Sequence, residues 1–254
     1  MSAQVHALKA INTRVEAPED GAALFGPVPF KVFTQRDLDR IPQLARLSPA
    51  QRFEMKVVSS VLPFRVNQYV IDELIDWANV PADPIFQLTF PQRGMLAPEH
   101  YERIAELIRN EAPKDELERA IDEVRHALNP HPADQMAMNM PRDEHGKRLD
   151  GMQHKYRETV LFFPSQGQTC HSYCTFCFRW AQFVGDKELR IASSEASALH
   201  DYLRKHTEVT DLLVTGGDPM VMKTRHLRDY LEPLLQPEFD HIQTIRIGSK
   251  ALTF

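Results

Sequence analysis

The chain has 254 residues, of which 43% are hydrophobic and 26% are charged, proportions typical of a globular protein with one large domain or two modest ones. Its net charge of -5 gives no global basic field that would recruit nucleic acid or an anionic membrane. No apolar run approaches the roughly 20 residues that a membrane-spanning helix needs, and the first residues, MSAQVHALKAINTRVEAPEDG, lack the apolar core of a secretory signal. We therefore expect neither a nucleic-acid partner nor a membrane partner.

The cysteines indicate a metal site rather than disulfide bonds. The chain has three of them, Cys170, Cys174 and Cys177, whereas a disulfide framework uses an even number spread along the sequence. Thiols gathered in one short stretch are typical of metal ligation in a reducing compartment. We therefore predict a cytoplasmic protein.

The first part of the chain predicts helices. Residues 1–35 contain several prolines and are expected to form a loosely structured arm with one short helix. Ser48 and Pro49 are an N-cap and a proline at the first helical position, so a helix begins there. Apolar stripes at helical spacing predict three further helices, over residues 69–77, 97–110 and 117–128.

A long connection separates this part from the next. Residues 129–153 are rich in proline, methionine and charge and lack a helical or a strand period. We therefore divide the chain into a helical N-terminal region over residues 1–150 and a second region over residues 151–254.

The second region alternates strands and helices. Apolar runs predict strands over residues 160–163, 211–215 and 242–247. A helix capped by Ser193 or Ser194 and another helix over residues 224–235 lie between them. This alternation is typical of an α/β fold with a parallel sheet, in which chemistry takes place at the carboxyl ends of the strands. The cysteines follow the first strand, and a pair of glycines follows the second.

The spacing of the cysteines is Cys-x3-Cys-x2-Cys. Three thiolates in one loop can hold three irons of a 4Fe–4S cluster and leave the fourth iron open to a substrate. Thiolates also suit zinc, but a structural zinc site is closed by a fourth ligand. His171 is adjacent to a cysteine and His154 would need a long loop, so zinc is the weaker alternative.

The segment Cys170 to Cys177, with the aromatic Phe176 directly before the third cysteine, resembles the signature of the radical S-adenosylmethionine superfamily. The resemblance implies a partial (β/α) barrel of TIM type. It also implies that the open iron chelates S-adenosylmethionine and that the reduced cluster cleaves it to a 5′-deoxyadenosyl radical, which takes a hydrogen from the substrate. Phe176 would lie beside the adenine.

Two later segments extend the resemblance. Gly216 and Gly217 match the superfamily motif whose backbone contacts the amino group of S-adenosylmethionine, and glycine suits a close approach of backbone to ligand. Asp218 would either bind the same ammonium group or cap the following turn. The segment 245–250, with Ser249 as a further cofactor-binding residue, resembles the lysine 2,3-aminomutase family, as do residues 83–85 and 151–156.

Members of that family use pyridoxal 5′-phosphate to move an amino group between adjacent carbons of an amino acid. The resemblance implies that Arg179 grips the carboxylate of the substrate, because a guanidinium meets a carboxylate with two hydrogen bonds. It also implies a low-potential reductant, such as flavodoxin or ferredoxin, as a partner. The oligomeric state stays open, with a homo-oligomer as one option, and we assign no catalytic residue.

The sequence departs from the family at several positions. Arg179 is a single arginine where the family has several basic residues, and Thr159 stands where we expect an arginine near the pyridoxal phosphate, although Lys155 matches. Lys250 does not match the position of the Schiff-base lysine. With three predicted strands of about six, we expect the N-terminal half of a barrel. The alternatives are a radical enzyme with another substrate and no pyridoxal phosphate, or a non-catalytic fragment that binds a cluster or zinc.

Overall fold

The computed structural model describes residues 30–186, 189–251 and 253. Residues from Val32 onward form one compact unit. Most of the predicted N-terminal arm lies outside the described residues, and the end of that segment forms strand β1 (Val32–Thr34), which pairs antiparallel with β2 (Arg65–Asn67). The division of the chain at residue 150 stays a prediction.

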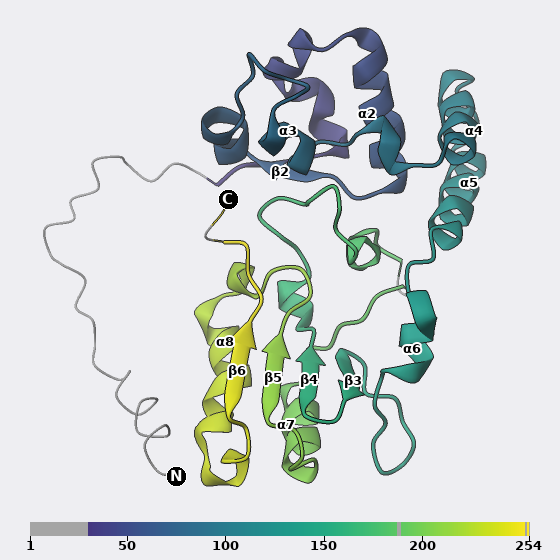
Figure 1. The fold of residues 1–254 in the computed structure, drawn as a ribbon. Helices are drawn as coiled ribbons and strands as arrows, with labels where there is room; N and C mark the ends of the chain where they lie inside the picture. The colour runs from purple at the N-terminus through teal and green to yellow at the C-terminus, as the bar shows by residue number, and fades with distance from the viewer. Residues whose placement is uncertain (1–29, 187–188, 252, 254) are drawn as a thin grey trace, which may run out of the picture. The chain divides into compact units, whose positions relative to one another are not determined.

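Helices fill the first half of the described chain, as predicted (Figure 1). The α-helices are α2 (Pro49–Val61), α3 (Pro84–Thr89), α4 (Pro98–Arg109), α5 (Lys114–Ala127), α6 (Gln135–Met138), α7 (Ala196–Lys205) and α8 (Thr224–Leu231). Short 3-10 segments are Gln35–Arg40, Pro42–Arg46, Arg93–Met95, Pro132–Asp134, Ser165–Gly167, Trp180–Phe183, Pro219–Val221, Glu232–Leu235 and Pro237–Phe239.

Helix α2 begins where the sequence predicts it. The Ser48 hydroxyl accepts a hydrogen bond from the Gln51 backbone N–H at 3.2 Å, and the Gln51 side chain accepts one from the Ser48 backbone N–H at 3.0 Å. This reciprocal pair satisfies two of the N–H groups that a helix start leaves without partners. Pro49 then supplies the first helical residue.

The predicted helix over residues 69–77 forms only in its first part. Gln68 and Tyr69 are α-helical, Val70–Leu74 continue as a π-helical turn, and the helix ends before Ile75, which is extended. The Asn67 side chain accepts from the Val70 N–H at 2.9 Å, and the Trp77 indole donates to the Ile71 carbonyl at 2.7 Å. Ile71 and Ile75 are nevertheless buried, whereas Tyr69 is exposed.

The main sheet has the strand order β3-β4-β5-β6. Its strands are β3 (Met152–Tyr156), β4 (Thr159–Phe162), β5 (Asp211–Val214) and β6 (Thr244–Ile247). β4, β5 and β6 are parallel, with Val160 opposite Leu212 and Leu212 opposite Ile245, which confirms the predicted α/β class. Strand β3 is antiparallel to β4 and was not predicted. Within the described residues the sheet is open.

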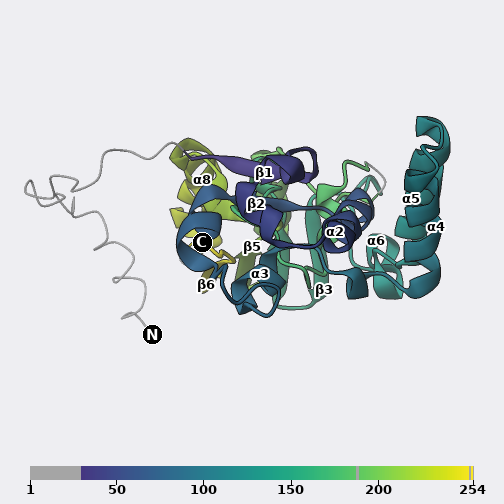
Figure 2. The ribbon, with the colours of Figure 1, turned by 90° about the horizontal axis from the view of Figure 1, so that it is seen from above.

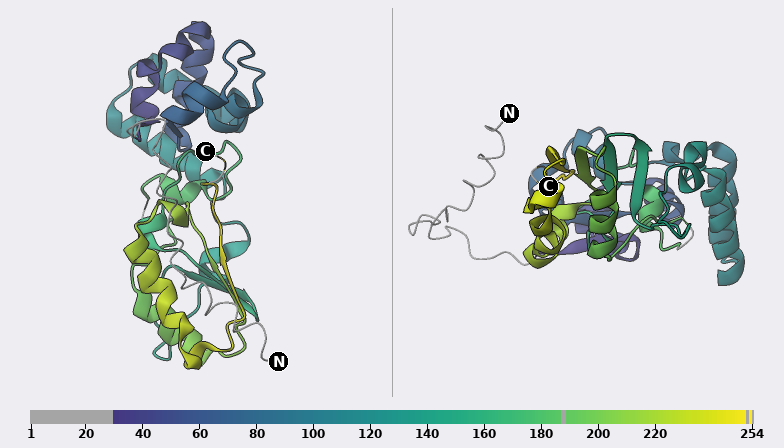
Figure 3. Two further views of the ribbon diagram at one scale, coloured as in Figure 1. Left: turned by 90° about the vertical axis from the view of Figure 1, so that its left-hand side faces the viewer. Right: turned by 90° about the horizontal axis from the view of Figure 1, so that it is seen from below.

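Side chains along β4 and β5 alternate between buried and partly buried positions, and the buried ones form the core on one face of the sheet. Val160 and Phe162 on β4 are buried, as are Leu212 and Val214 on β5, because every second side chain of a strand points to the same face. They pack with residues of α7 and α8 in one cluster, and both helices lie along one face of the sheet (Figure 3). Helix α7 begins later than predicted, because the Ser193 backbone pairs with Phe163 and Ser165 instead of capping the helix.

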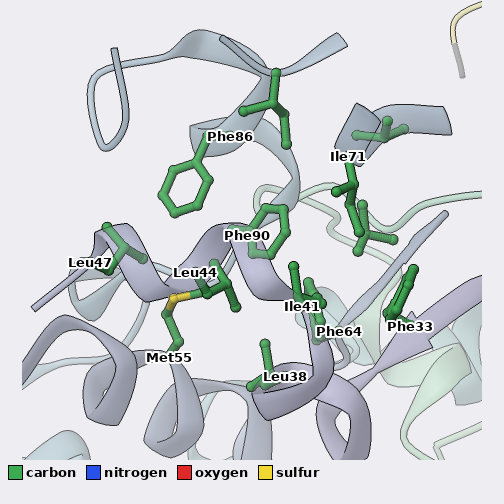
Figure 4. Close-up of a cluster of buried hydrophobic side chains, with 13 residues drawn as sticks. Phe33, Leu38, Ile41, Leu44, Leu47, Met55, Phe64, Ile71, Phe86 and Phe90 are labelled. Carbon is green, nitrogen blue, oxygen red and sulfur yellow. The ribbon is translucent and has the colours of Figure 1, made fainter. Parts of the chain in front are cut away.

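A second core supports β1 and β2. The Phe86 and Phe90 rings stack with centroids 4.8 Å apart, and Trp77 meets both rings edge-on. The close-up in Figure 4 shows these phenylalanines facing Leu44, Leu47 and Met55. This core fixes the segments 65–67 and 84–90, which carry the contacts to the cysteine loop described below. Among the described residues no helix is long and apolar enough to cross a membrane.

Candidate functional site

The carboxyl ends of the three parallel strands bring the predicted site residues together. The cysteine loop follows β4, the glycine pair follows β5, and Ser249 and Lys250 follow β6. Hydrogen bonds described below join all three exits. In Figure 1 the ends of these strands point toward the segments that carry β2 and α3, and the cysteine loop lies between them. The view from above shows α3 and β2 over this end of the sheet (Figure 2).

The three cysteines are free thiols and are partly buried. Burial is the largest of the causes that raise the pKa of Cys170 to about 12, and the charges of Cys177, Asp218 and Cys174 act in the same direction while Lys250 opposes them. Burial also raises the pKa of Cys177. Removing the protons of Cys170 and Cys177 is therefore unfavourable unless a cation compensates the charge.

This donor set fits an iron–sulfur cluster. Such clusters are held by thiolates, and the metal supplies the positive charge that the buried thiols lack. Among the described residues, no three His, Cys, Asp or Glu side chains converge on a single metal position. His154, weighed above as a zinc ligand, has both ring nitrogens engaged, by the Tyr202 hydroxyl at 2.6 Å and the Arg157 carbonyl at 3.1 Å.

The raised pKa of Cys170 predicts slow alkylation of the metal-free chain. A thiol of pKa about 12 instead of 9.0 has about a thousandfold less thiolate at pH 8, and the thiolate is the reactive form. We expect the reaction of Cys170 with iodoacetamide, followed by mass spectrometry, to accelerate about tenfold per pH unit up to pH 10. In urea, the alkylation rate of the same thiol should level off above pH 9. Equal pH profiles for the folded and unfolded chain would contradict this.

The glycine pair is required by packing within the chain. Gly216 has a φ of +132°, and a Cβ there would lie 2.2 Å from Nε2 of Gln168. A Cβ on Gly217 would lie 2.3 Å from the Thr169 carbonyl oxygen. A side chain at position 217 would meet backbone and push the β5 exit away from the entry of the cysteine loop, whereas at position 216 the positive φ and the Gln168 side chain oppose any residue other than glycine. Their contact with S-adenosylmethionine stays a prediction.

Asp218 is 1% exposed, and both of its carboxylate oxygens have partners. Oδ1 accepts from the Met220 N–H at 2.9 Å and from the Ser249 hydroxyl at 2.8 Å, and Oδ2 accepts from the Lys250 N–H at 2.8 Å. Its own N–H donates to the carbonyls of Gly167 and Thr169. The structure thus shows Asp218 in the capping role that the sequence left open.

The cysteine loop is also held from the other side, by segments that are distant in sequence. The Tyr173 N–H donates to the Arg65 carbonyl at 2.8 Å, and the Thr175 N–H donates to the Leu88 carbonyl at 2.8 Å. The Ser172 hydroxyl accepts from the Asn67 N–H at 3.2 Å. Sequence reasoning missed this clamp because backbone carbonyls carry no residue-type signal.

Replacing Ser172 with alanine is expected to destabilise the fold by about 1–2 kcal/mol, because the buried Asn67 N–H then loses its acceptor. The free energy of unfolding, measured with urea, is the readout. Ser197→Ala is the control, since Ser197 is exposed on α7 and such changes stay within about 0.5 kcal/mol. Equal stabilities of the two variants would contradict the role of this bond.

The remaining predicted residues surround the cysteines. Phe176 is 73% exposed, and the Lys250 ammonium lies 5.3 Å from the centre of its ring. Arg179 lies over the rings of Phe163 and Phe178, at 4.7 Å and 5.1 Å. Burial lowers the pKa of Arg179, and Cys177 opposes this. The roles of these side chains toward a cofactor or substrate stay predictions.

No family model matches the chain. It is 30% identical over 202 residues to a putative L-lysine 2,3-aminomutase of Aquifex aeolicus, covering 80% of this chain and 42% of that protein. It is 24% identical over 200 residues to an L-lysine 2,3-aminomutase of Methanococcus maripaludis, covering 79% and 37% of the two chains. A third relative, an L-lysine 2,3-aminomutase of Bacillus subtilis, is 30% identical over 103 residues, which are 41% of this chain and 21% of that protein. The chain thus spans less than half the length of the relatives it matches.

Proposed function

Because the chain belongs to the lysine 2,3-aminomutase-like family, we propose that it is a radical S-adenosylmethionine protein that holds a 4Fe–4S cluster on Cys170, Cys174 and Cys177. The observation that carries the proposal is that the loop with these partly buried thiols contacts the exits of β5 and β6 at one end of a parallel sheet. We further propose that this sheet is part of a (β/α) barrel of TIM type.

When bound, the cluster and S-adenosylmethionine supply a 5′-deoxyadenosyl radical for hydrogen abstraction. The protein's part is to hold and orient them and to exclude water. The clamp on Tyr173 and Thr175 and the packing of Gly217 against Thr169 fix the loop from two sides. Rigid support of this kind keeps ligand side chains in place before the metal binds.

Four further residues take roles toward S-adenosylmethionine in this proposal. The exposed ring of Phe176 offers a face to the adenine, and the backbone of Gly216 and Gly217 lies beside the cysteine loop. Ser249 serves through its hydrogen bond to Asp218, which places the β6 exit at the site. A low-potential reductant such as flavodoxin or ferredoxin is the proposed electron donor.

We propose Arg179 as the residue that binds the carboxylate of an amino-acid substrate. It lines a small cavity of about 80 Å³ together with Gln153, His131 and Phe163. Its partly buried guanidinium lies over the rings of Phe163 and Phe178, and a planar guanidinium can meet a carboxylate with two hydrogen bonds. A cavity of this size admits only a small group, such as a carboxylate.

We propose migration of an amino group as the activity of the whole protein, because the chain resembles L-lysine 2,3-aminomutases over 80% of its own length. The residues at two positions implied for pyridoxal phosphate do not make a phosphate site here. Lys155 is exposed beside Tyr156, and the Thr159 hydroxyl donates to Asp211 at 3.0 Å. This disagreement favours, as a second candidate, a radical enzyme that acts without pyridoxal phosphate.

Anaerobic incubation of the reconstituted chain with dithionite and S-adenosylmethionine tests the proposal. We expect release of 5′-deoxyadenosine, detected by liquid chromatography, because a cluster held by the three cysteines together with a reductant would suffice for that cleavage. Omission of dithionite is the control. An iron-loaded chain that released no 5′-deoxyadenosine would contradict the proposal, and a chain that bound one zinc ion and no sulfide would favour a non-catalytic zinc protein.

The cytoplasmic location remains a prediction, in accord with the three free thiols.

A further inference from the structure

One residue, Asp218, joins the exits of all three parallel strands through its carboxylate and its backbone N–H. Asp218, on the β5 exit, accepts hydrogen bonds from the Ser249 hydroxyl and the Lys250 N–H on the β6 exit. The Asp218 N–H donates to carbonyls of Gly167 and Thr169 on the β4 exit. Because Asp218 is almost completely buried, these bonds are shielded from water, and the position of the β6 exit depends on them.

The consequence of this arrangement is the position of the Lys250 side chain. Its ammonium donates to Sγ of Cys174 at 2.7 Å and lies 5.3 Å from the centre of the Phe176 ring. Two residues of the cysteine loop thus contact one cation that comes from the exit of β6, 76 residues beyond Cys174. At Cys177, the charges of Arg179 and Lys250 both lower the pKa, against the larger effect of burial.

We propose that Asp218 is a positioning residue that holds Lys250 against Cys174, and that the Lys250 ammonium raises the midpoint potential of the cluster bound there. The inference rests on the proposed function, since it concerns the cluster. One electron from the external reductant adds one negative charge to the cluster, and a fixed cation beside a ligand sulfur stabilises that reduced state. Charge and hydrogen bonds at the ligand sulfurs are established determinants of cluster potential.

The experiment is an anaerobic potentiometric titration of the reconstituted full chain, followed by electron paramagnetic resonance, with iron and sulfide measured in each sample. Lys250→Gln should lower the midpoint potential by about 59 mV, which is a tenfold change in the equilibrium of a one-electron couple. Lys250→Arg should retain the potential of the unmodified chain, because it keeps the charge. Lys250→Met is a second neutral variant, for use if Lys250→Gln binds less iron.

The positioning role is tested by combining Lys250→Gln with Asp218→Asn. Asp218→Asn also removes a negative charge, which by itself raises the potential. This direct effect of the lost charge on the potential should be the same whether position 250 holds lysine or glutamine. Displacement of the ammonium, in contrast, can change the potential only when lysine is present. We therefore expect Asp218→Asn to shift the potential in a more negative direction when Lys250 is present than when it is replaced.

The possible results separate this inference from the proposed function. Equal effects of Asp218→Asn in both backgrounds would overturn the positioning role. A neutral variant with full iron and an unchanged potential would overturn the role of the Lys250 charge. An unmodified chain that takes up no iron and no sulfide would instead overturn the proposed function, and with it the basis for both.

Discussion

Replacement of Cys174 with alanine is expected to reduce the iron content of the reconstituted chain from about four atoms to less than one. Cys174 is the middle ligand of the loop in this proposal, so its loss leaves two thiols, and it also removes the acceptor of one hydrogen bond from Lys250. Release of 5′-deoxyadenosine should fall below detection. Iron and sulfide analysis beside the chromatographic assay measures both effects.

The matched control for this change is Phe178→Leu, which alters an exposed side chain directly after the third cysteine. It should keep the iron content of the unmodified chain, because Phe178 supplies no donor atom. If Cys174→Ala retained four irons per chain, the assignment of Cys174 as a cluster ligand would be wrong. Cys174→Ser distinguishes loss of the thiol from loss of side-chain volume.

Gly217→Ala is expected to destabilise the fold by about 3 kcal/mol, at the upper end for overpacked sites. The new Cβ would lie 2.3 Å from the carbonyl oxygen and 2.4 Å from the amide nitrogen of Thr169. Both are backbone atoms, so neither can turn aside as a flexible side chain does. The free energy of unfolding in urea measures the effect, and iron uptake should fall with it because the cysteine loop begins at this contact.

Gly94→Ala is the control, since a Cβ at Gly94 has no atom within 4 Å. Alanine there should leave stability unchanged or raise it by up to about 1 kcal/mol, through lower entropy of the unfolded chain. If Gly217→Ala were as stable as Gly94→Ala, the close packing of the β5 exit on the cysteine loop would be wrong.

Local signals predicted the elements that have local causes. The capping pair of Ser48 and Gln51 lies within one turn, so the start of α2 can be predicted from the sequence. The buried run at Val160 and the run at Leu212 predicted parallel strands, and the structure confirms them. Strand β3 was missed because its residues are half exposed and follow a polar connection, so only pairing with β4 makes them a strand.

The site was predictable only in part, for the same reason. The cysteine spacing and the order of the motifs can be read from the sequence, because each motif is short. The contact of Lys250 with Cys174 spans 76 residues, and the bond from Tyr173 to Arg65 uses a backbone carbonyl. No sequence pattern predicts either contact. Both depend on the positions that the folded chain gives to the strand ends and to the β2 segment.

Iron and sulfide analysis of the anaerobically reconstituted chain tests the central claim most directly. The claim is that Cys170, Cys174 and Cys177 together hold one 4Fe–4S cluster. The expected result is about four irons and four sulfides per chain, lost when any one of the three cysteines is replaced. One zinc ion per chain without sulfide, bound by the same thiols, would contradict it.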